Sequence, residues 1–253
     1  MVGFESIKAK RTFELIADVL KDRIFAGQYR PGDRLPAERE MAEMLAVGRP
    51  AVREAYRALE LIGIVEVRKG KEGGAFIREP DYRSVTRSLT DLVRLRHVSL
   101  ADLTEARLML EKTVAELAMK RVVAGDLVAL NGWIDRAIAK LDVGLSAADE
   151  NIGFHIRLAE ISGNPVLVMV LSSIMDLLAV VLRALGSDRK HSREVAEDHH
   201  AIVTALKTRE FARLWPVMER HIRASNERLT ALAKKSKLPF GTEKSVAPHK
   251  QVG

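Results

Sequence analysis

Three arginines in the first quarter of the chain have the side-chain type and the spacing to recognise DNA. Arg39, Arg49 and Arg53 fall within one short stretch of the 253-residue sequence. A guanidinium group can make paired hydrogen bonds to guanine, which contribute about 1–3 kcal/mol of base discrimination per contact. Helical residues four positions apart share a face, so Arg49 and Arg53 would project together from one helix. Arginines also occur on solvated surfaces, and the elements that carry them decide between the two interpretations.

The segments around these arginines are expected to form a helix-turn-helix. Apolar periodicity and turn residues predict helices over 13–25, 37–45 and 50–62. Pro50 suits the first helical position, and Gly63 suits a helix end. In such a motif the first residues of the last helix reach base edges in the major groove. Arg49 would lie at the start of that helix, and Arg39 at the start of the preceding one.

A small hairpin is expected to complete the N-terminal domain. Two β-like runs, 64–68 and 75–78, flank a glycine-rich, basic tip. Three helices followed by a hairpin make a winged helix-turn-helix, which we predict over residues 1–80. Residues 81–84 are expected to form a linker.

The rest of the chain is expected to be helical. Periodic segments predict helices over 85–96, 101–122, 126–141, 147–161, 165–185, 194–207 and 209–235. Ser99, Ser146 and Asn164 are expected N-caps, and Pro216 should kink the last helix. The predicted fold class is therefore mainly α, with an all-helical bundle domain over 85–235. A disordered basic tail is predicted over 236–253.

Composition narrows the function classes. The chain has no cysteine, which excludes disulfides, thiolate catalysis and cysteine zinc sites. Its net charge of +7 permits a polyanionic partner, but residues 1–80 hold fifteen basic against thirteen acidic side chains. The case for DNA therefore rests on where the arginines lie. The apolar run 166–185 is interrupted by polar residues and predicts a buried helix, and no signal peptide is visible, so we expect a cytoplasmic protein without a membrane partner.

The N-terminal pattern resembles the GntR family of bacterial transcription regulators over roughly residues 13–78. The matching residues are Ile24, Gly27, 31–40 (PGDRLPAERE), 49–55 (RPAVREA), Leu59 and 63–65 (GIV). The resemblance implies that Arg39, Arg49 and Arg53 contact operator DNA. It also implies that Lys69 and Gly70 of the wing enter the minor groove. One departure is Gly48, where the family usually has Ser or Thr and a hydroxyl can reach a phosphate.

The second part, about residues 85–232, resembles the all-helical FCD ligand-binding domain of the FadR subfamily. The matching residues are 105–107 (EAR) with Glu111, 151–155 (NIGFH) with 162–164 (SGN), His199 before Ile202, and 219–222 (ERHI). The resemblance implies a divalent metal, Zn²⁺ or Ni²⁺, at the positions of Asn151, His155, His199 and His221. Asn151 stands where the subfamily has an aspartate, so it adds no negative charge. The other interpretation is that these histidines are polar residues at the edge of a core.

The same resemblance implies a small organic acid as effector. Arg107 is the candidate to hold its carboxylate, and a salt bridge from Arg107 to Glu111 is the alternative. His200 follows His199 and would point about 100° away, toward the surface.

Together these features predict a dimeric, ligand-responsive transcription factor, expected to be a repressor. Its partners would be operator DNA, a small carboxylate and a second copy of the chain. Two other functions stay open: a metal-dependent enzyme that uses the three histidines, and an architectural DNA-binding protein without an effector. The sequence offers the enzyme no convincing general base and no glycine-rich phosphate loop.

Overall fold

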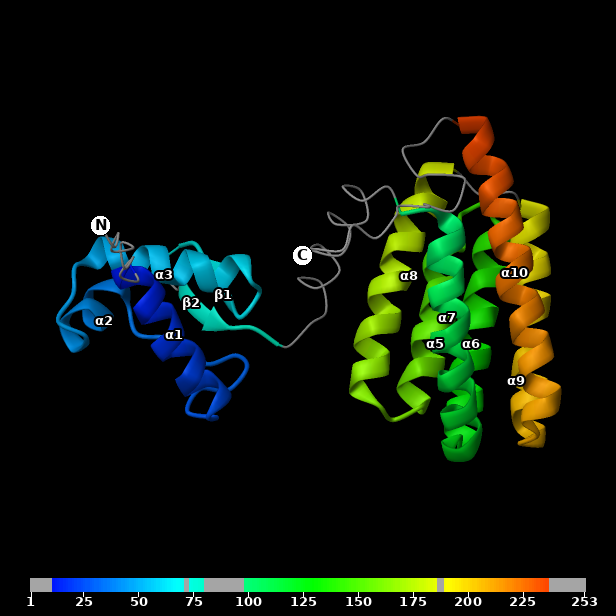
Figure 1. Cartoon of the computed structure of the whole chain (residues 1–253), viewed down its shortest axis with the longest axis horizontal. Helices are drawn as coiled ribbons and strands as arrows, with labels where there is room; N and C mark the ends of the chain where they lie inside the picture. Colours follow the sequence, from blue (N-terminus) through cyan, green and yellow to red (C-terminus); the bar gives the residue numbers. More distant parts are fainter. Residues whose placement is uncertain (1–10, 71–72, 80–97, 186–188, 237–253) are drawn as a thin grey trace, which may run out of the picture. The chain divides into compact units, whose positions relative to one another are not determined.

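The computed structural model describes residues 11–70, 73–79, 98–185 and 189–236 (Figure 1). The chain divides into two compact units, Met1–Ser84 and Val85–Gly253. The predicted helix over 85–96, the linker over 81–84 and almost all of the predicted tail over 236–253 lie outside the described residues. The domain boundaries therefore stay predictions.

The N-terminal unit is a winged helix-turn-helix, as predicted. Its elements are α1 (Thr12–Phe25), α2 (Glu38–Met44), α3 (Arg49–Leu61), β1 (Val65–Arg68) and β2 (Gly74–Ile77). The two strands are antiparallel, with Val65 opposite Ile77 and Arg68 opposite Gly74. Helix α3 begins one residue earlier and ends one residue earlier than the sequence predicts.

Turn residues and a small core hold the N-terminal unit together. Gly27 and Gly63 follow α1 and α3 at φ values of 75° and 80°, the left-handed conformation that glycine adopts at helix ends. Leu20 of α1 and Val52 of α3 are almost completely buried in one apolar cluster with the first strand. The Tyr56 hydroxyl donates a hydrogen bond of 2.7 Å to the carbonyl of Pro36, which ties α3 to the turn before α2.

The C-terminal unit is all-helical within its described residues, which confirms the predicted fold class. Its helices are α5 (Leu100–Arg121), α6 (Ala124–Asp142), α7 (Ala148–Ile161), α8 (Pro165–Leu185), α9 (Arg189–Thr208) and α10 (Phe211–Ser236). Helix α7 packs against α5, α6 and α8, and α10 packs against α5, α8 and α9. Helix α9 starts at Arg189, five residues before its predicted start.

The apolar run predicted to be buried forms α8. Its Leu171, Met175 and Leu177 are at most 1% exposed and belong to the main core cluster. Helix α8 therefore packs its apolar side chains into the core of the bundle. Among the described helices, none combines the length and the apolar content needed to cross a membrane.

The side chains of all three predicted N-caps accept a hydrogen bond from an amide in the first turn of a helix. The Ser99 hydroxyl accepts a hydrogen bond of 3.1 Å from the Asp102 amide, and Asn164 Oδ1 accepts one of 3.0 Å from the Val166 amide. The Ser146 hydroxyl accepts one of 3.3 Å from the Ala148 amide, although Ala147 is the residue directly before α7. Pro216 lies inside α10, and the helix continues beyond it.

Candidate functional site

The three arginines predicted to contact DNA lie on the surface of the helix-turn-helix. Arg49 is the first residue of α3, Arg53 lies one turn later, and Arg39 is the second residue of α2. All three side chains are exposed. Arg49 and Arg53 thus lie at the start of the second helix of the motif, the part from which such motifs reach base edges, and Arg39 lies on the helix before it.

Acidic neighbours pair with two of these arginines. Arg53 Nε lies 3.1 Å from Glu38 Oε2, and Arg39 Nε lies 3.5 Å from Glu43 Oε1. Exposed pairs of this kind contribute about 0–1 kcal/mol, so a phosphate or a base can replace the carboxylate at little cost. Arg49 forms no ion pair with any residue that the structure describes.

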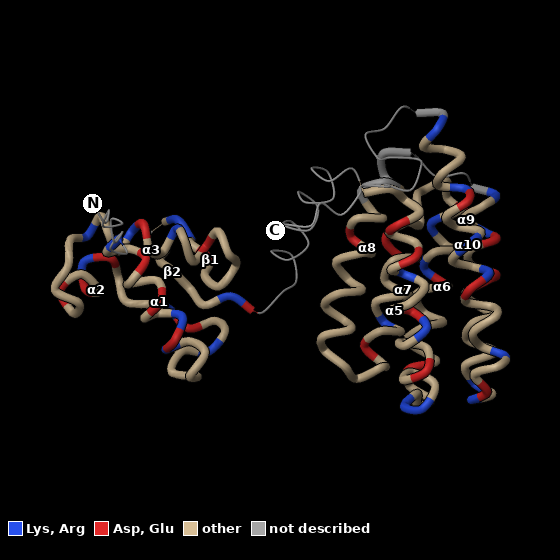
Figure 2. The backbone as a smooth tube through the Cα atoms, viewed as in Figure 1, with Lys and Arg blue, Asp and Glu red and all other residues tan. Residues whose placement is uncertain are grey.

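The wing residues Lys69 and Gly70 are both exposed. Gly70 has a φ of 106°, a conformation that side-chain-bearing residues rarely adopt. Arg34 braces the hairpin, because its Nη2 donates a hydrogen bond of 2.6 Å to the carbonyl of Gly73. Figure 2 shows acidic and basic positions interspersed along this unit, in line with its near balance of charge.

Gly48 is the N-cap of α3 and provides no side-chain cap. A Cβ atom there would meet only Pro50 Cδ, at an ordinary distance of 3.6 Å.

We expect Gly48→Ser to stabilise the chain by a few tenths of a kcal/mol, about the difference between these residues at an N-cap. We also expect operator affinity to rise about tenfold through one added phosphate hydrogen bond. Fluorescence anisotropy with labelled operator measures this. Gly48→Ala adds the carbon without the hydroxyl, so equal affinities for the two variants would contradict the prediction.

Three buried histidines from three helices meet in the C-terminal unit. His155 of α7, His199 of α9 and His221 of α10 are 3%, 1% and 2% exposed. The Nε2 atom of His155 lies 3.2 Å from Nε2 of His221 and 3.3 Å from Nε2 of His199. Two nitrogen ligands of one tetrahedral Zn²⁺ ion, each 2.0–2.1 Å from it, lie about 3.3–3.4 Å apart. The two observed spacings lie close to that range.

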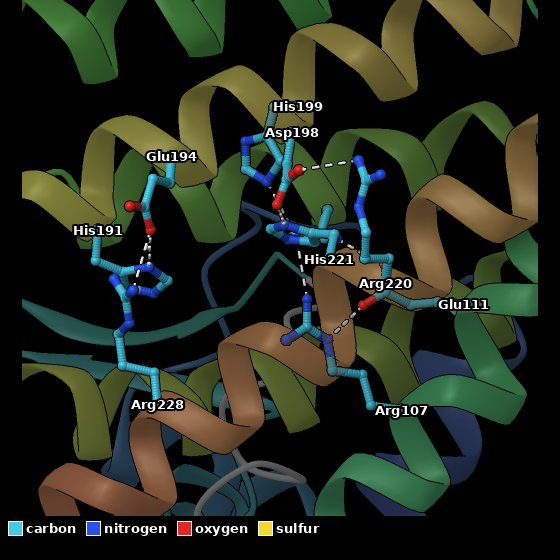
Figure 3. A network of polar contacts seen from close by, with 10 residues as sticks. Arg107, Glu111, His191, Glu194, Asp198, His199, Arg220, His221 and Arg228 are labelled. Carbon is cyan, nitrogen blue, oxygen red and sulfur yellow. Dashed lines mark hydrogen bonds and ion pairs between the residues drawn. The ribbon is translucent and has the colours of Figure 1, made fainter.

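Carboxylates set the tautomers of two of these rings. His155 Nδ1 lies 2.8 Å from Glu111 Oε2. His221 Nδ1 lies 3.3 Å from Asp198 Oδ2 (Figure 3). An ionised carboxylate only accepts hydrogen bonds, so each Nδ1 carries the proton and each Nε2 keeps its lone pair. Metal-binding histidines commonly have this arrangement, which fixes the ring and makes it a better ligand.

The pKa values of the cluster favour the ligating forms. Burial lowers the pKa of His155 to about 4, despite the Glu111 carboxylate beside it. Burial also holds the pKa of His199 well below its usual value. Burial alone would raise the pKa of Glu111, but Arg107 and His155 outweigh it and hold that pKa at about 2. At neutral pH both rings are therefore neutral and Glu111 is ionised.

Two further residues fit a metal site at the histidines. The Asn151 Oδ1 atom is buried, has no hydrogen-bond partner among the described residues, and lines the same cavity as the histidines. Asn151 lies one turn before His155 on α7, so the two side chains share a face. The Phe154 ring stacks on His199 with centroids 3.9 Å apart, which fixes the orientation of that ring. The donor set therefore fits a divalent cation.

Arg107 forms the salt bridge to Glu111 that the sequence offers as one alternative, and its role toward an effector stays a prediction. Its Nε donates to Glu111 Oε1 at 2.5 Å, and its Nη2 lies 3.0 Å from His155 Nε2. The side chain is 8% exposed and points toward the histidines (Figure 3). The salt bridge thus holds the guanidinium at the cavity.

The cavity beside the histidines has a volume of about 80 Å³. Apolar side chains of α8 and α10, among them Met175, Leu178 and Leu229, form much of its wall.

Two polar residues near the histidines in the sequence do not join the site. His200 is exposed, as predicted. Glu150 pairs with Lys140 at 2.7 Å and does not belong to the set of candidate metal ligands.

Sequence reasoning missed several partners of the predicted site residues. Asp198 directly precedes His199 in the sequence, but its carboxylate contacts His221. This contact exists because α9 packs against α10. Glu38 lies fifteen positions from Arg53, and no local pattern links them. Phe154 is adjacent to His155, and its place beside His199 depends on the packing of α7 against α9.

Comparison with known proteins decides the family. Residues 12–77 match the gntR family of bacterial regulatory proteins, and residues 102–224 match the FCD domain. The chain is 30% identical to the Uxu operon transcriptional regulator of Escherichia coli K12 over 229 residues, 87% of this chain and 88% of that protein. The chain belongs to the GntR family. It is a transcription regulator with a DNA-binding helix-turn-helix, not an enzyme.

Other similar proteins agree with this assignment. The GntR-family chain is 27% identical to the transcriptional repressor NanR of Salmonella typhimurium, over 90% of its own length and 88% of that of NanR. Among solved structures, Streptococcus agalactiae GntR aligns with 85% of this chain and 99% of its own, at 28% identity and a TM-score of 0.64. The FadR subfamily and the individual site residues stay predictions.

Proposed function

We propose that this GntR-family regulator is a cytoplasmic, homodimeric repressor that releases its operator when a small organic acid binds in the FCD domain. The supporting observation is the convergence of the His155, His199 and His221 Nε2 atoms beside a cavity. One relative, NanR, is named a repressor, which supports repression over activation. The cavity also argues against a purely architectural DNA-binding protein.

In this proposal the helical domain holds a divalent metal and the carboxylate of the effector. His155, His199, His221 and Asn151 would hold Zn²⁺ or Ni²⁺, which supplies a positive charge and an open position for a carboxylate oxygen when bound. Glu111 and Asp198 keep two imidazoles in the ligating tautomer. Arg107 offers a second positive group at the same end of the cavity.

The winged helix-turn-helix supplies the DNA contacts. Arg49 and Arg53 would reach base edges from α3, Arg39 would approach from α2, and Lys69 with Gly70 would enter the minor groove. An effector releases DNA only if it binds one arrangement of the dimer more tightly than the other.

Selection of DNA from a random pool tests the proposal. Metal-loaded protein is expected to enrich sequences with two inverted half-sites at a fixed spacing, as a two-fold symmetric dimer requires. A panel of small carboxylates is then added to the bound complex, and at least one is expected to release it. Enrichment of no sequence, or release by no acid, would overturn the proposal.

A further inference from the structure

A groove separates helix α3 from the wing hairpin in the N-terminal unit. It has a volume of about 450 Å³ and is lined by α3, by the turn before α2 and by residues of the hairpin. Helix α3 packs against β1, which holds the two walls of the groove together (Figure 1). Its described lining residues include four basic and two acidic side chains, namely Arg34, Arg53, Arg57 and Lys69 against Glu38 and Glu60.

The wing fixes Arg34 at one wall of this groove. Arg34 Nη2 donates a hydrogen bond of 2.6 Å to the Gly73 carbonyl, and Arg34 Cζ lies 5.9 Å from the centroid of the Phe76 ring. A Cβ atom on Gly74 would lie 2.7 Å from Arg34 Nε, so glycine there leaves room for the guanidinium. A guanidinium group has five N–H donors, and the bond to Gly73 uses one of them. The others form no hydrogen bond with a residue that the structure describes, and they remain available to a ligand.

Arg57 faces the groove from the opposite wall, on α3. It follows Arg49 and Arg53 at intervals of four residues, and each interval turns the side chain by about 40° around the helix axis. Arg57 therefore points about 80° away from Arg49, and it lines the groove while Arg49 does not. Its side chain is exposed and forms no ion pair within the described part of the chain.

The acidic lining residues have other partners. Glu38 Oε2 lies 3.1 Å from Arg53 Nε, and Glu60 Oε1 accepts a hydrogen bond of 3.2 Å from the Val67 amide. Neither carboxylate pairs with the other two arginines of the groove in the described residues. Those two guanidinium groups thus keep their positive charge for an anion that enters the groove.

The path of DNA across a winged helix-turn-helix leads one strand to this groove. The proposed function places α3 in the major groove and Lys69 with Gly70 in the minor groove. In B-DNA a single sugar–phosphate strand separates a major groove from the adjacent minor groove. That strand must therefore cross the space between α3 and the wing, where Arg34 and Arg57 lie.

We propose that Arg34 and Arg57 hold the phosphates of this strand from the two walls of the groove. The inference rests on the proposed function, which defines how α3 and the wing meet DNA. A guanidinium group matches the geometry of a phosphate and can donate two parallel hydrogen bonds to it. Phosphate contacts fix the register of a protein on the duplex and carry no sequence information directly. Arg34 and Arg57 thus position α3 so that Arg49 can reach its base.

A base contact from Arg57 is the main alternative, because Arg57 shares α3 with Arg49 and Arg53. The two roles differ in what a substitution does to unrelated DNA. Loss of a base contact weakens the operator alone, whereas loss of a phosphate contact weakens every sequence about equally. Each lost phosphate contact also lowers the slope of log K against log salt by about 0.9.

Fluorescence anisotropy with the full, metal-loaded chain tests the inference. Affinities for a selected operator and for an unrelated duplex are measured at several salt concentrations. Arg34→Met and Arg57→Met are each expected to weaken both complexes about tenfold, as removal of a charge-assisted hydrogen bond does, and to lower the salt slope by about 0.9. Arg23→Met, which removes an exposed arginine of α1 outside the groove, is the matched control and should keep the wild-type slope.

Neutral phosphates keep the inference testable if a variant folds poorly. Single phosphates of the operator are replaced, one at a time, by uncharged methylphosphonate. Wild-type affinity is expected to fall about tenfold at the phosphates of the strand between the major-groove and minor-groove contacts. At the phosphate that Arg57 holds, the same replacement should cost Arg57→Met nothing further, because that contact is already lost.

The outcomes separate this inference from the proposed function. Unchanged affinity and salt slope in Arg34→Met and Arg57→Met, with operator still bound specifically, would overturn the phosphate contacts alone. A loss confined to the operator would overturn them as well, since it indicates base recognition. Equal sensitivity of wild type and Arg57→Met to every methylphosphonate would have the same meaning. A wild-type chain that binds no sequence specifically would overturn both proposals.

Discussion

Replacing Arg49 by alanine is expected to reduce the affinity for a selected operator about 5- to 150-fold. That range corresponds to one good guanidinium–base contact of about 1–3 kcal/mol. Arg49 opens α3, is exposed, and has no ion pair among the described residues, so no intramolecular interaction offsets the loss. Fluorescence anisotropy at one fixed salt concentration, with operator and with unrelated DNA, measures the effect.

The control for the Arg49 experiment is Arg23→Ala. Arg23 is an exposed residue in the last turn of α1, outside the helix-turn-helix pair, and its loss changes the net charge by the same amount. A base contact predicts a loss for operator in Arg49→Ala alone, with little change for unrelated DNA. Equal losses in the two variants would mean that charge, not base recognition, carries the effect.

Replacing His199 by alanine is expected to weaken metal binding by more than about 100-fold. Partners that only orient a ligand are worth 10- to 100-fold, so removal of a ligand itself should exceed that range. After dialysis, inductively coupled plasma mass spectrometry should find about one Zn²⁺ or Ni²⁺ per wild-type chain and background levels in the variant. The exposed neighbour offers a matched control, because His200→Ala should keep its metal.

Two measurements keep the metal prediction testable if His199→Ala folds poorly. A chelator should lower the melting temperature of the wild-type chain, and added metal should restore it, because binding to the native state alone stabilises it. Asn151→Asp places a negative charge at the fourth position and should tighten binding. A wild-type chain without metal, whose melting temperature does not respond to Zn²⁺ or Ni²⁺, would refute the metal site.

Local patterns in the sequence predict the helices well where a helix face or a cap defines them. Ser99 and Gly63 mark helix ends that the structure reproduces, because a cap and a left-handed glycine act within a few residues. The start of α9 was missed, because residues 189–193 are polar and show no apolar periodicity. Helix formation there depends on contacts with residues that are distant in the sequence.

Part of the candidate site can likewise be predicted from local spacing, and the rest depends on how the helices pack. Asn151 and His155 are one turn apart, so their shared face follows from spacing alone. The contacts from Glu111 to His155 and from Asp198 to His221 join different helices and follow only from packing.

The ion pairs on the arginines that we predict to contact DNA bear on how this regulator searches a genome. Glu38 and Glu43 occupy Arg53 and Arg39 in the free protein, so any DNA must compete with a carboxylate already in place. A random sequence offers only phosphates, which gain little from that exchange, whereas an operator adds base contacts. Breaking these exposed pairs costs about 0–1 kcal/mol each on any DNA, so the acidic residues weaken random and operator complexes alike, and base contacts alone discriminate between them. The regulator is consequently held for a shorter time on irrelevant DNA during its search.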